Sequence, residues 1–193
     1  MERPRETLHN KGVGLRRWRR DDLDEMLRVV TEALDHLTPW MPWAEDYDRE
    51  KGAAFLEACD AGWESGKEYG YAILSDAGAI IGSAGMMARI GPGGLEIGYW
   101  LHPDHTGRGV ATRAAEALVL EAFRIGADRV EIVHDAANRA SGAVPRRLGF
   151  TEVDRRPPQE PVTAAEDGVD VVWRLLRQPS SAGTSRSASE LMQ

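Results

Sequence analysis

The sequence predicts an α/β protein in which a central, mixed and mostly antiparallel sheet carries helices on both faces. In the first third of the chain, apolar residues recur at helical spacing. Short apolar runs separated by turn residues then indicate strands. Beyond residue 102, single helices and strands alternate, as in layered mixed sheets. The expected order is a strand, two helices, three strands, a helix, a strand, a short helix and two strands.

The first expected elements are a strand at residues 13–18 and a helix at residues 21–37, which Asp21 or Asp22 is placed to cap. The proline-containing segment "TPWMPW" ends this helix, and a second helix runs from about residue 48 to residue 63. The chain then changes to the period of strands. The later elements are the strands "YGYAILSD", "AIIGSAGMMARI" and "LEIGYWL", a helix, the strand "DRVEIVHD", the short helix "NRASGAVPRRLG", and the strands "FTEVDRR" and "VDVVWRLL".

These patterns place one domain at residues 12–177. We expect residues 1–11 to be a flexible N-terminus. We expect residues 178–193, which are rich in Ser, Gly and Ala and poor in large apolar side chains, to be a disordered tail.

Composition narrows the function classes. The chain has 193 residues, of which 42% are hydrophobic and 28% charged, as in ordinary globular proteins. Its net charge of −7 argues against a general nucleic-acid binder. The single cysteine, Cys59, forms no intrachain disulfide and lies in a helical pattern, where a small buried side chain is expected. No signal peptide or membrane-spanning run is present, so we expect a soluble cytoplasmic protein.

Residues 102–123, "HPDHTGRGVATRAAEALVLEAF", begin as a loop and continue as a helix. Gly107 and Gly109 lie where the loop becomes the helix, although glycine costs about 1 kcal/mol in a helix relative to alanine. The first amides of a helix lack intrahelical partners, and without a Cβ atom an anion can approach them closely. Arg108 adds a guanidinium at the same place. The alternative is a glycine-rich turn that only begins the helix.

Two familiar phosphate loops do not fit this segment. The P-loop pattern G-x-x-x-x-G-K-[ST] is absent from the chain. The dinucleotide pattern G-x-G-x-x-G/A fails at Thr112, and the strand before the loop is the third of a meander rather than the first of a βαβ unit. The loop therefore predicts an anion site of another kind.

Two segments resemble motifs of the GNAT acyltransferases, in the branch that includes the RimJ and RimL enzymes. "EIGYWLHPDHTGRGVATRAAEALVLEAF" resembles the acetyl-CoA-binding segment, with Gly107 and Gly109 at its two small positions and Asp104 where Gln or Arg is common. "NRASGAVPRRLGF" resembles a second segment of this branch, and Pro145, which removes a backbone donor inside a short helix, departs from it. The matching residues of the second segment are Asn138, Ser141, Val144, Leu148, Gly149 and Phe150.

The resemblance covers about residues 12–176 and implies the GNAT fold, with acetyl-CoA as co-substrate and no metal. It implies that the diphosphate of CoA lies on the amides of the glycine loop. The pantetheine arm then lies where the strand "IGYWL" splays from its neighbour. Homodimers are common in the family. The residues that the resemblance places at acetyl-CoA are Trp100, Leu101, Thr106, Gly107, Arg108, Gly109, Val110, Ala111, Asn138 and Ser141.

The implied reaction is the direct attack of an amine, from a protein N-terminus or a small molecule, on the thioester. Glu96, the only charge in an apolar strand, is the candidate base, on the same strand face as Trp100; the alternative is a strand-end glutamate that reaches solvent. Ser141 is the candidate acid for the departing thiolate, as proposed in the RimL-like branch; the alternative is an ordinary serine in the first turn of a helix. Asn138 caps that helix in either case.

In the family, the region of Trp40, Met41 and Trp43 lines the acceptor pocket, although tryptophans are also common in cores. His134 is either a base acting through water or a structural histidine. His102 and His105 lack an evident third ligand, so no zinc site is expected. Residues 16–20 form a solvated basic patch or a contact for RNA or a ribosomal partner.

The sequence therefore predicts an acyl-CoA-dependent N-acetyltransferase. A CoA-binding module without catalysis, and an acyltransferase that uses succinyl-CoA, are the alternatives.

Overall fold

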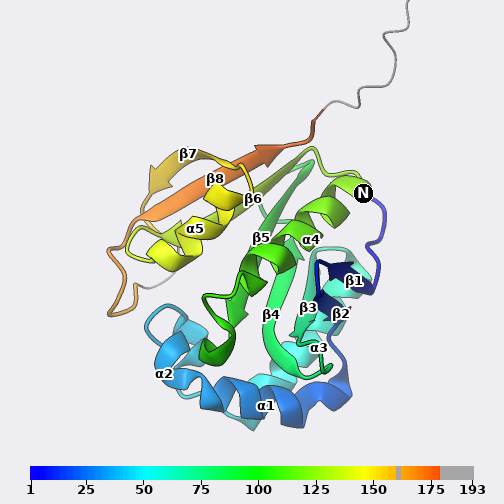
Figure 1. Ribbon diagram of the computed structural model, residues 1–193, viewed down its shortest axis with the longest axis vertical. Helices are drawn as coiled ribbons and strands as arrows, with labels where there is room; N and C mark the ends of the chain where they lie inside the picture. The colour runs from blue at the N-terminus through cyan, green and yellow to red at the C-terminus, as the bar shows by residue number, and fades with distance from the viewer. Residues whose placement is uncertain (160–161, 179–193) are drawn as a thin grey trace, which may run out of the picture.

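The computed structural model describes residues 1–159 and 162–178, and it confirms the mixed α/β class (Figure 1). Eight strands form one sheet in the order β1-β2-β3-β4-β5-β6-β8-β7. Neighbouring strands in this part of the chain are antiparallel except β5 and β6, which are parallel. The strands are β1 (Thr7–Asn10), β2 (Val13–Arg17), β3 (Glu68–Leu74), β4 (Ile80–Met87), β5 (Gly94–Leu101), β6 (Arg129–Asp135), β7 (Thr151–Arg156) and β8 (Asp170–Leu176).

Helices cover both faces of the sheet (Figure 1). The helix α4 packs through Ala114 and Leu118 into a large core cluster with the side chains of β5 and β6. A second cluster, on the opposite face, joins α1 and α3 to β3 and β4. The helices are α1 (Leu23–Glu32), α2 (Leu34–Leu37), α3 (Arg49–Ser65), α4 (Val110–Arg124) and α5 (Arg139–Arg147), with short 3-10 turns at Arg20–Asp22, Pro42–Ala44 and Pro103–His105.

The N-terminal segment differs from the sequence-based expectation. Residues 7–10, expected to be flexible, form β1, an antiparallel edge strand in which Leu8 faces Leu15 and is only 7% exposed. The amide of Arg5 donates a hydrogen bond of 2.7 Å to Glu121 on α4. The sequence does not predict this four-residue strand, because its one buried apolar side chain gives no repeating pattern. The expected tail lies, from residue 179, outside the described residues.

The helix expected at residues 21–37 is divided in two. Ala33, with φ −104° and ψ 1°, interrupts it between α1 and α2. Asp22 does not cap the amides of α1; its carboxylate instead accepts two hydrogen bonds, of 2.6 and 2.7 Å, from the guanidinium of Arg16. The next helix begins and ends as expected: Asp48 accepts a hydrogen bond from the amide of Lys51, and Gly66 follows the last turn.

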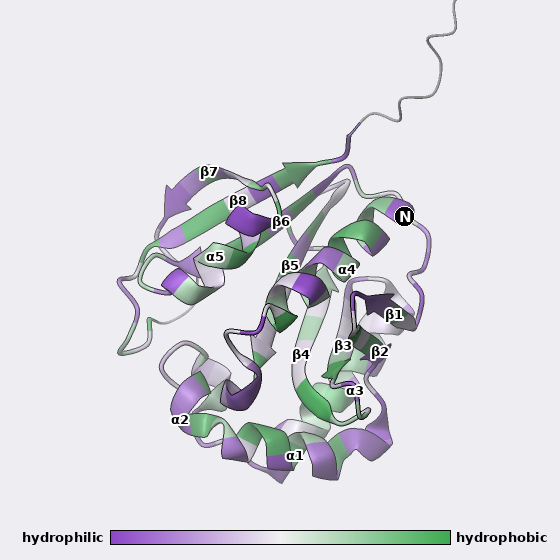
Figure 2. Cartoon of the chain, in the orientation of Figure 1, coloured by the Kyte–Doolittle hydropathy of each residue, from purple (hydrophilic) through white to green (hydrophobic). Residues whose placement is uncertain are grey.

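The far edge of the sheet is polar. All but the last residue of β7 are exposed, and Figure 2 shows much of this strand in the hydrophilic colour. Charged edge strands oppose pairing with the sheets of other chains. The polar side chains of β7 therefore protect this edge of the sheet from pairing with another chain.

Candidate active site

The two parallel strands at the centre of the sheet separate, as the family resemblance implied for "IGYWL". They are paired only at Gly94–Glu96 of β5 and Arg129–Glu131 of β6. Beyond this register the remaining residues of β5 pair with no strand on that side among the residues that the structure describes, while β6 continues to pair with β8. The separation leaves free backbone donors and acceptors along one edge of β5, which an extended ligand can use as an added strand would.

A cleft of about 980 Å³ opens at this separation. It brings together both candidate catalytic residues and the proposed acceptor-pocket residues, although these are far apart in the sequence. Sequence-predicted site residues that line the cleft are Trp40, Met41, Trp43, Glu96, Trp100, Asn138 and Ser141. Leu101 and the glycine loop do not line it. Leu101 is 6% exposed and belongs to the core cluster, so its side chain packs inside the protein.

The glycine loop lies at the N-terminus of α4. Gly107 and Gly109 have φ of +70° and +72°, in the left-handed region that favours glycine. No side chain caps the helix. In the described chain, the amides of residues 107–112 donate no hydrogen bond to protein acceptors. They form a row of open donors at the positive end of a 15-residue helix.

One side chain near the glycine loop holds the loop in place, and two others are exposed to solvent. Arg113 donates a hydrogen bond of 3.1 Å from Nη1 to the carbonyl of Arg108, across the loop. Arg108 and Thr106 are exposed, whereas Val110 is 9% exposed and packs in the core. Val110 and Ala111 therefore offer amides to a ligand, and Arg108 offers a guanidinium.

Glu96 is buried in the cleft wall rather than open to solvent. It is 7% exposed, and its Oε1 lies 2.5 Å from Nη2 of Arg89. Its neighbours Leu95 and Ile97 lie in the core cluster under α4, while Trp100 packs with the cluster of α1 and α3. Strand alternation therefore directs Glu96 toward the face covered by α1 and α3. The solvent-reaching alternative does not apply to this side chain.

Ser141 lies on the other face, in the first turn of α5. Its amide donates a hydrogen bond of 3.0 Å to the side chain of Asn138, the cap that the sequence predicted. The hydroxyl of Tyr99, which the sequence analysis did not single out, donates to the Ser141 carbonyl at 3.2 Å and lies 3.4 Å from its Oγ. Burial raises the pKa of Tyr99 to about 12, so this hydroxyl keeps its proton at neutral pH.

Pro145 explains why Tyr99 is needed there. In a regular helix, the amide of residue 145 would donate to the carbonyl of Ser141, and proline has no such amide. The Tyr99 hydroxyl takes the place of that donor. The loss of the amide at Pro145 is therefore compensated by a hydrogen bond from Tyr99 on β5, which fixes the backbone of Ser141.

The histidines have structural partners. Nδ1 of His134 lies 2.7 Å from the Asp135 carbonyl, and its Nε2 accepts a hydrogen bond of 2.9 Å from Trp173. Burial lowers the pKa of His134, so it is neutral at pH 7 and both ring nitrogens are occupied. The rings of His102 and His105 lie 6.1 Å apart, and no group of three metal-binding side chains occurs within the described residues.

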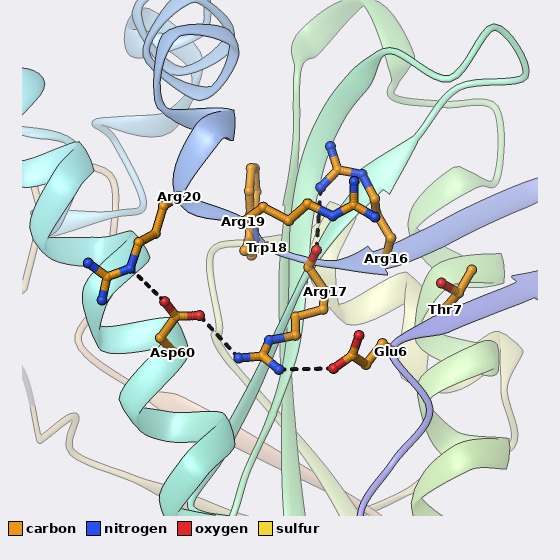
Figure 3. Close-up of a pocket in the computed structure, with 8 residues that line it drawn as sticks. All are labelled: Glu6, Thr7, Arg16, Arg17, Trp18, Arg19, Arg20 and Asp60. Atoms are coloured by element: carbon orange, nitrogen blue, oxygen red, sulfur yellow. Dashed lines mark hydrogen bonds and ion pairs between the residues drawn. The ribbon is translucent and has the colours of Figure 1, made fainter.

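The basic run at residues 16–20 is largely neutralised by ion pairs. Figure 3 shows Arg17 between Glu6 and Asp60, with Arg20 on the same Asp60. The hollow that these side chains line has a volume of about 310 Å³. The prediction of a solvated basic patch is therefore wrong for Arg16 and Arg17, which are mostly buried in ion pairs, whereas Arg20 pairs with Asp60 and stays exposed.

Fold and site define an α/β protein with a cleft between splayed central strands and an open helix N-terminus beside it. Over residues 13–151 the sequence matches the family described as acetyltransferase (GNAT) domain. The chain belongs to this family, whose members transfer an acetyl group from acetyl-CoA. No helix in the part of the chain that the structure describes is long and apolar enough to span a membrane.

One relative with a ribosomal acetyltransferase name is similar to a short part of the chain. A segment is 41% identical over 58 residues to the protein named putative ribosomal N-acetyltransferase YdaF, from Bacillus subtilis (strain 168). This match spans 30% of the chain and 32%, about a third, of that relative's length.

Two solved structures share the fold. RimL, the ribosomal L7/L12 alpha-N-protein acetyltransferase in complex with CoA, has a TM-score of 0.80 at 20% identity, with 89% of this chain and 98% of that chain covered. RimJ of Mycobacterium smegmatis, in complex with CoA-disulfide, has a TM-score of 0.77 at 23% identity, with 88% and 85% covered.

Proposed function

We propose that the protein transfers the acetyl group of acetyl-CoA to a primary amine, with the N-terminus of a protein as the acceptor. The observation that carries this proposal is the cleft between β5 and β6, because it is lined from both faces of the sheet. Glu96 faces the side of α1 and α3, and the Tyr99–Ser141 pair faces the side of α4 and α5. Two reactants that enter from opposite faces meet between these groups.

The donor occupies the side of α4. The diphosphate binds the open amides of residues 107–112 and the guanidinium of Arg108, and the pantetheine arm extends along the unpaired edge of β5 toward Asn138. Nothing in this arrangement requires a metal, because the helix N-terminus supplies the positive charge. The fit supports acetyl-CoA as the donor, and the length of the acyl group is a property that the experiment below measures.

The acceptor enters beside Trp40, Met41 and Trp43. The ring of Trp43 lies 5.9 Å from that of Trp100 and is 40% exposed, so it forms a wall of the cleft rather than a core contact. The names of the relatives, which describe acetyltransferases of ribosomal proteins, support a peptide amine.

The chemistry follows from the positions of the two candidate residues. The acceptor ammonium gives one proton to Glu96, and the neutral nitrogen attacks the thioester carbonyl, forming a C–N bond. The C–S bond then breaks, and Ser141 passes its hydroxyl proton to the thiolate. Ser141 recovers a proton from the cationic nitrogen of the adduct through solvent. The products are the acetylated amine, CoA thiol and one proton released through Glu96.

Mass spectrometry of peptides with free N-termini, incubated with the protein and acetyl-CoA or succinyl-CoA, tests the proposal. We expect acetylation of at least one peptide and the release of one CoA thiol per acetyl group. Glu96→Gln is expected to lower kcat by about 100-fold or more near neutral pH and to recover partly as pH rises, since general-base catalysis contributes about 10²–10⁴-fold. CoA binding without transfer to any amine would favour the non-catalytic alternative, and a Glu96→Gln enzyme at full rate would remove the base assignment.

A further inference from the structure

A second carboxylate lies beside Glu96 in the cleft. Glu131 on β6 is the direct register partner of Glu96 in the parallel pair, so the two side chains lie on the same face, with their strands about 4.8 Å apart. Glu131 is 4% exposed and lines the same cleft. Two like charges on adjacent strands repel each other unless a cation lies between or beside them.

Each carboxylate uses only one oxygen for an arginine. Oε1 of Glu131 accepts a hydrogen bond of 2.8 Å from Nε of Arg174 and forms ion pairs with Nη2 of Arg174, at 2.6 Å, and Nε of Arg129, at 3.8 Å. Oε1 of Glu96 contacts Arg89. The Oε2 atoms of both glutamates receive no hydrogen bond from any residue that the structure describes. Neither atom is among the fully buried polar atoms that lack a partner, so both remain accessible from the cleft. Two acceptor oxygens are therefore open where the strands separate.

The charge of the cleft favours a cation. Among the described residues that line it, six carboxylates outnumber four cationic side chains, and His134 is neutral. Such an excess of one sign in a concave site concentrates ligands of the opposite sign. The charged lining residues are Glu68, Glu96, Glu131, Asp135, Glu166 and Asp170 against Lys51, Arg89, Arg156 and Arg174.

We propose that Glu131 and Glu96 together bind the acceptor as its ammonium ion, before Glu96 takes the proton. The inference rests on the proposed acetyl transfer and deepens it by naming the acceptor class. Aliphatic amines, which are protonated at neutral pH, are accepted, and arylamines and alcohols are not. Arg174 holds the other oxygen of Glu131 and fixes the position of this carboxylate. Its role is to bind the ammonium and direct it toward Glu96.

The experiment compares two peptides by calorimetry on the CoA-bound protein. One is the peptide that the wild type acetylates fastest or, if none is acetylated, a serine-initiated hexapeptide; the other is its desamino analogue. We expect the wild type to bind the amine peptide at least about 10-fold more tightly. Glu131→Gln leaves Glu96 as the only carboxylate of the pair, so it should reduce this ratio several-fold and raise KM for the peptide about 10-fold, with KM for acetyl-CoA unchanged.

Glu121→Gln is the matched control. Glu121 is also buried, 3% exposed, and paired with an arginine, Arg124, but it lies on α4 and does not line the cleft. The Glu121→Gln variant should be less stable than the wild type but should keep the same ratio of affinities for the amine peptide and its desamino analogue. Equal affinity of the two peptides for the wild type, or an unchanged ratio in Glu131→Gln, would overturn the inference. If the wild type prefers the amine peptide but transfers no acetyl group, the result would support ammonium binding by Glu131 and Glu96 and contradict the proposed function instead.

Discussion

The two helices beside the cleft begin in opposite ways. The helix α4 begins at Gly109, in the left-handed region, and no side chain caps it. The helix α5 begins at Asn138, whose side chain accepts the amide of Ser141. A helix N-terminus carries about half a positive charge, which a cap or a ligand can satisfy. The difference indicates that the start of α5 is completed by the protein itself, while the start of α4 is left for an anion.

Replacing Gly109 with valine tests this difference most strongly. Valine is strained at φ +72°, and its Cβ would lie 3.1 Å from Nη1 of Arg113, so the loop must rearrange. We expect CoA affinity, measured by calorimetry, to fall by about 100-fold or more, which corresponds to about 2.7 kcal/mol. Gly78→Val, at φ +82° in the β3–β4 turn, is the matched control for strain alone. Equal affinity in both variants would mean that the glycines only shape a turn.

Ser141→Ala distinguishes chemistry from binding at the start of α5. The methyl side chain keeps the amide that Asn138 caps but removes the hydroxyl proton. A thiol with a pKa of about 8.5 can leave unprotonated at some cost, so kcat should fall by about 10- to 100-fold, less than for Glu96→Gln. A variant that loses CoA affinity but keeps kcat would make the serine a binding contact.

Tyr99→Phe tests whether β5 fixes the backbone of α5. Loss of the hydroxyl leaves the Ser141 carbonyl without its donor, which should cost about 1–2 kcal/mol of unfolding free energy and lower kcat several-fold. Adding Pro145→Ala supplies the missing helical amide, so the double variant should regain the stability. Denaturant unfolding of the wild type, both single variants and the double variant measures this coupling. Additive effects would show that Tyr99 does not replace the missing amide.

Asn138→Ala should have the smallest effect. Loss of a helix cap costs about 1 kcal/mol, or about 2–4 °C in Tm for a chain of this size. Asn138→Asp keeps the capping oxygen and should retain the wild-type Tm in a thermal scan. If both variants melt alike, below the wild type, the cap is not what stabilises this end of α5.

Much of the difference between the starts of α4 and α5 could be predicted from the sequence, because the residues that cause it lie at the helix starts themselves. The glycines at 107 and 109 mark a backbone conformation, and Asn138 three residues before Ser141 marks a cap. The separation of β5 from β6 was predicted only through the family resemblance, since no local pattern encodes where two strands stop pairing.

Contacts between distant segments were not predictable from the pattern. Glu131 stands in the apolar strand "DRVEIVHD", but only the register of β6 against β5 brings it beside Glu96. Pro145 departs from the family motif and leaves the Ser141 carbonyl without a helical donor. This gap indicated that another donor lies nearby, but the sequence did not show that the donor is Tyr99. The division of α1 from α2 falls at Ala33, which is buried in the second core cluster and is no helix breaker, so the local sequence does not predict it.

An NMR titration of the ¹⁵N-labelled protein with inorganic diphosphate tests the central claim, that the open end of α4 holds the phosphates of the donor. The account predicts that the largest amide shifts occur at residues 107–112, that those at residues 139–142 are small, and that Gly109→Val abolishes the former. Unchanged amides at residues 107–112, or equal shifts at the starts of both helices, would contradict it.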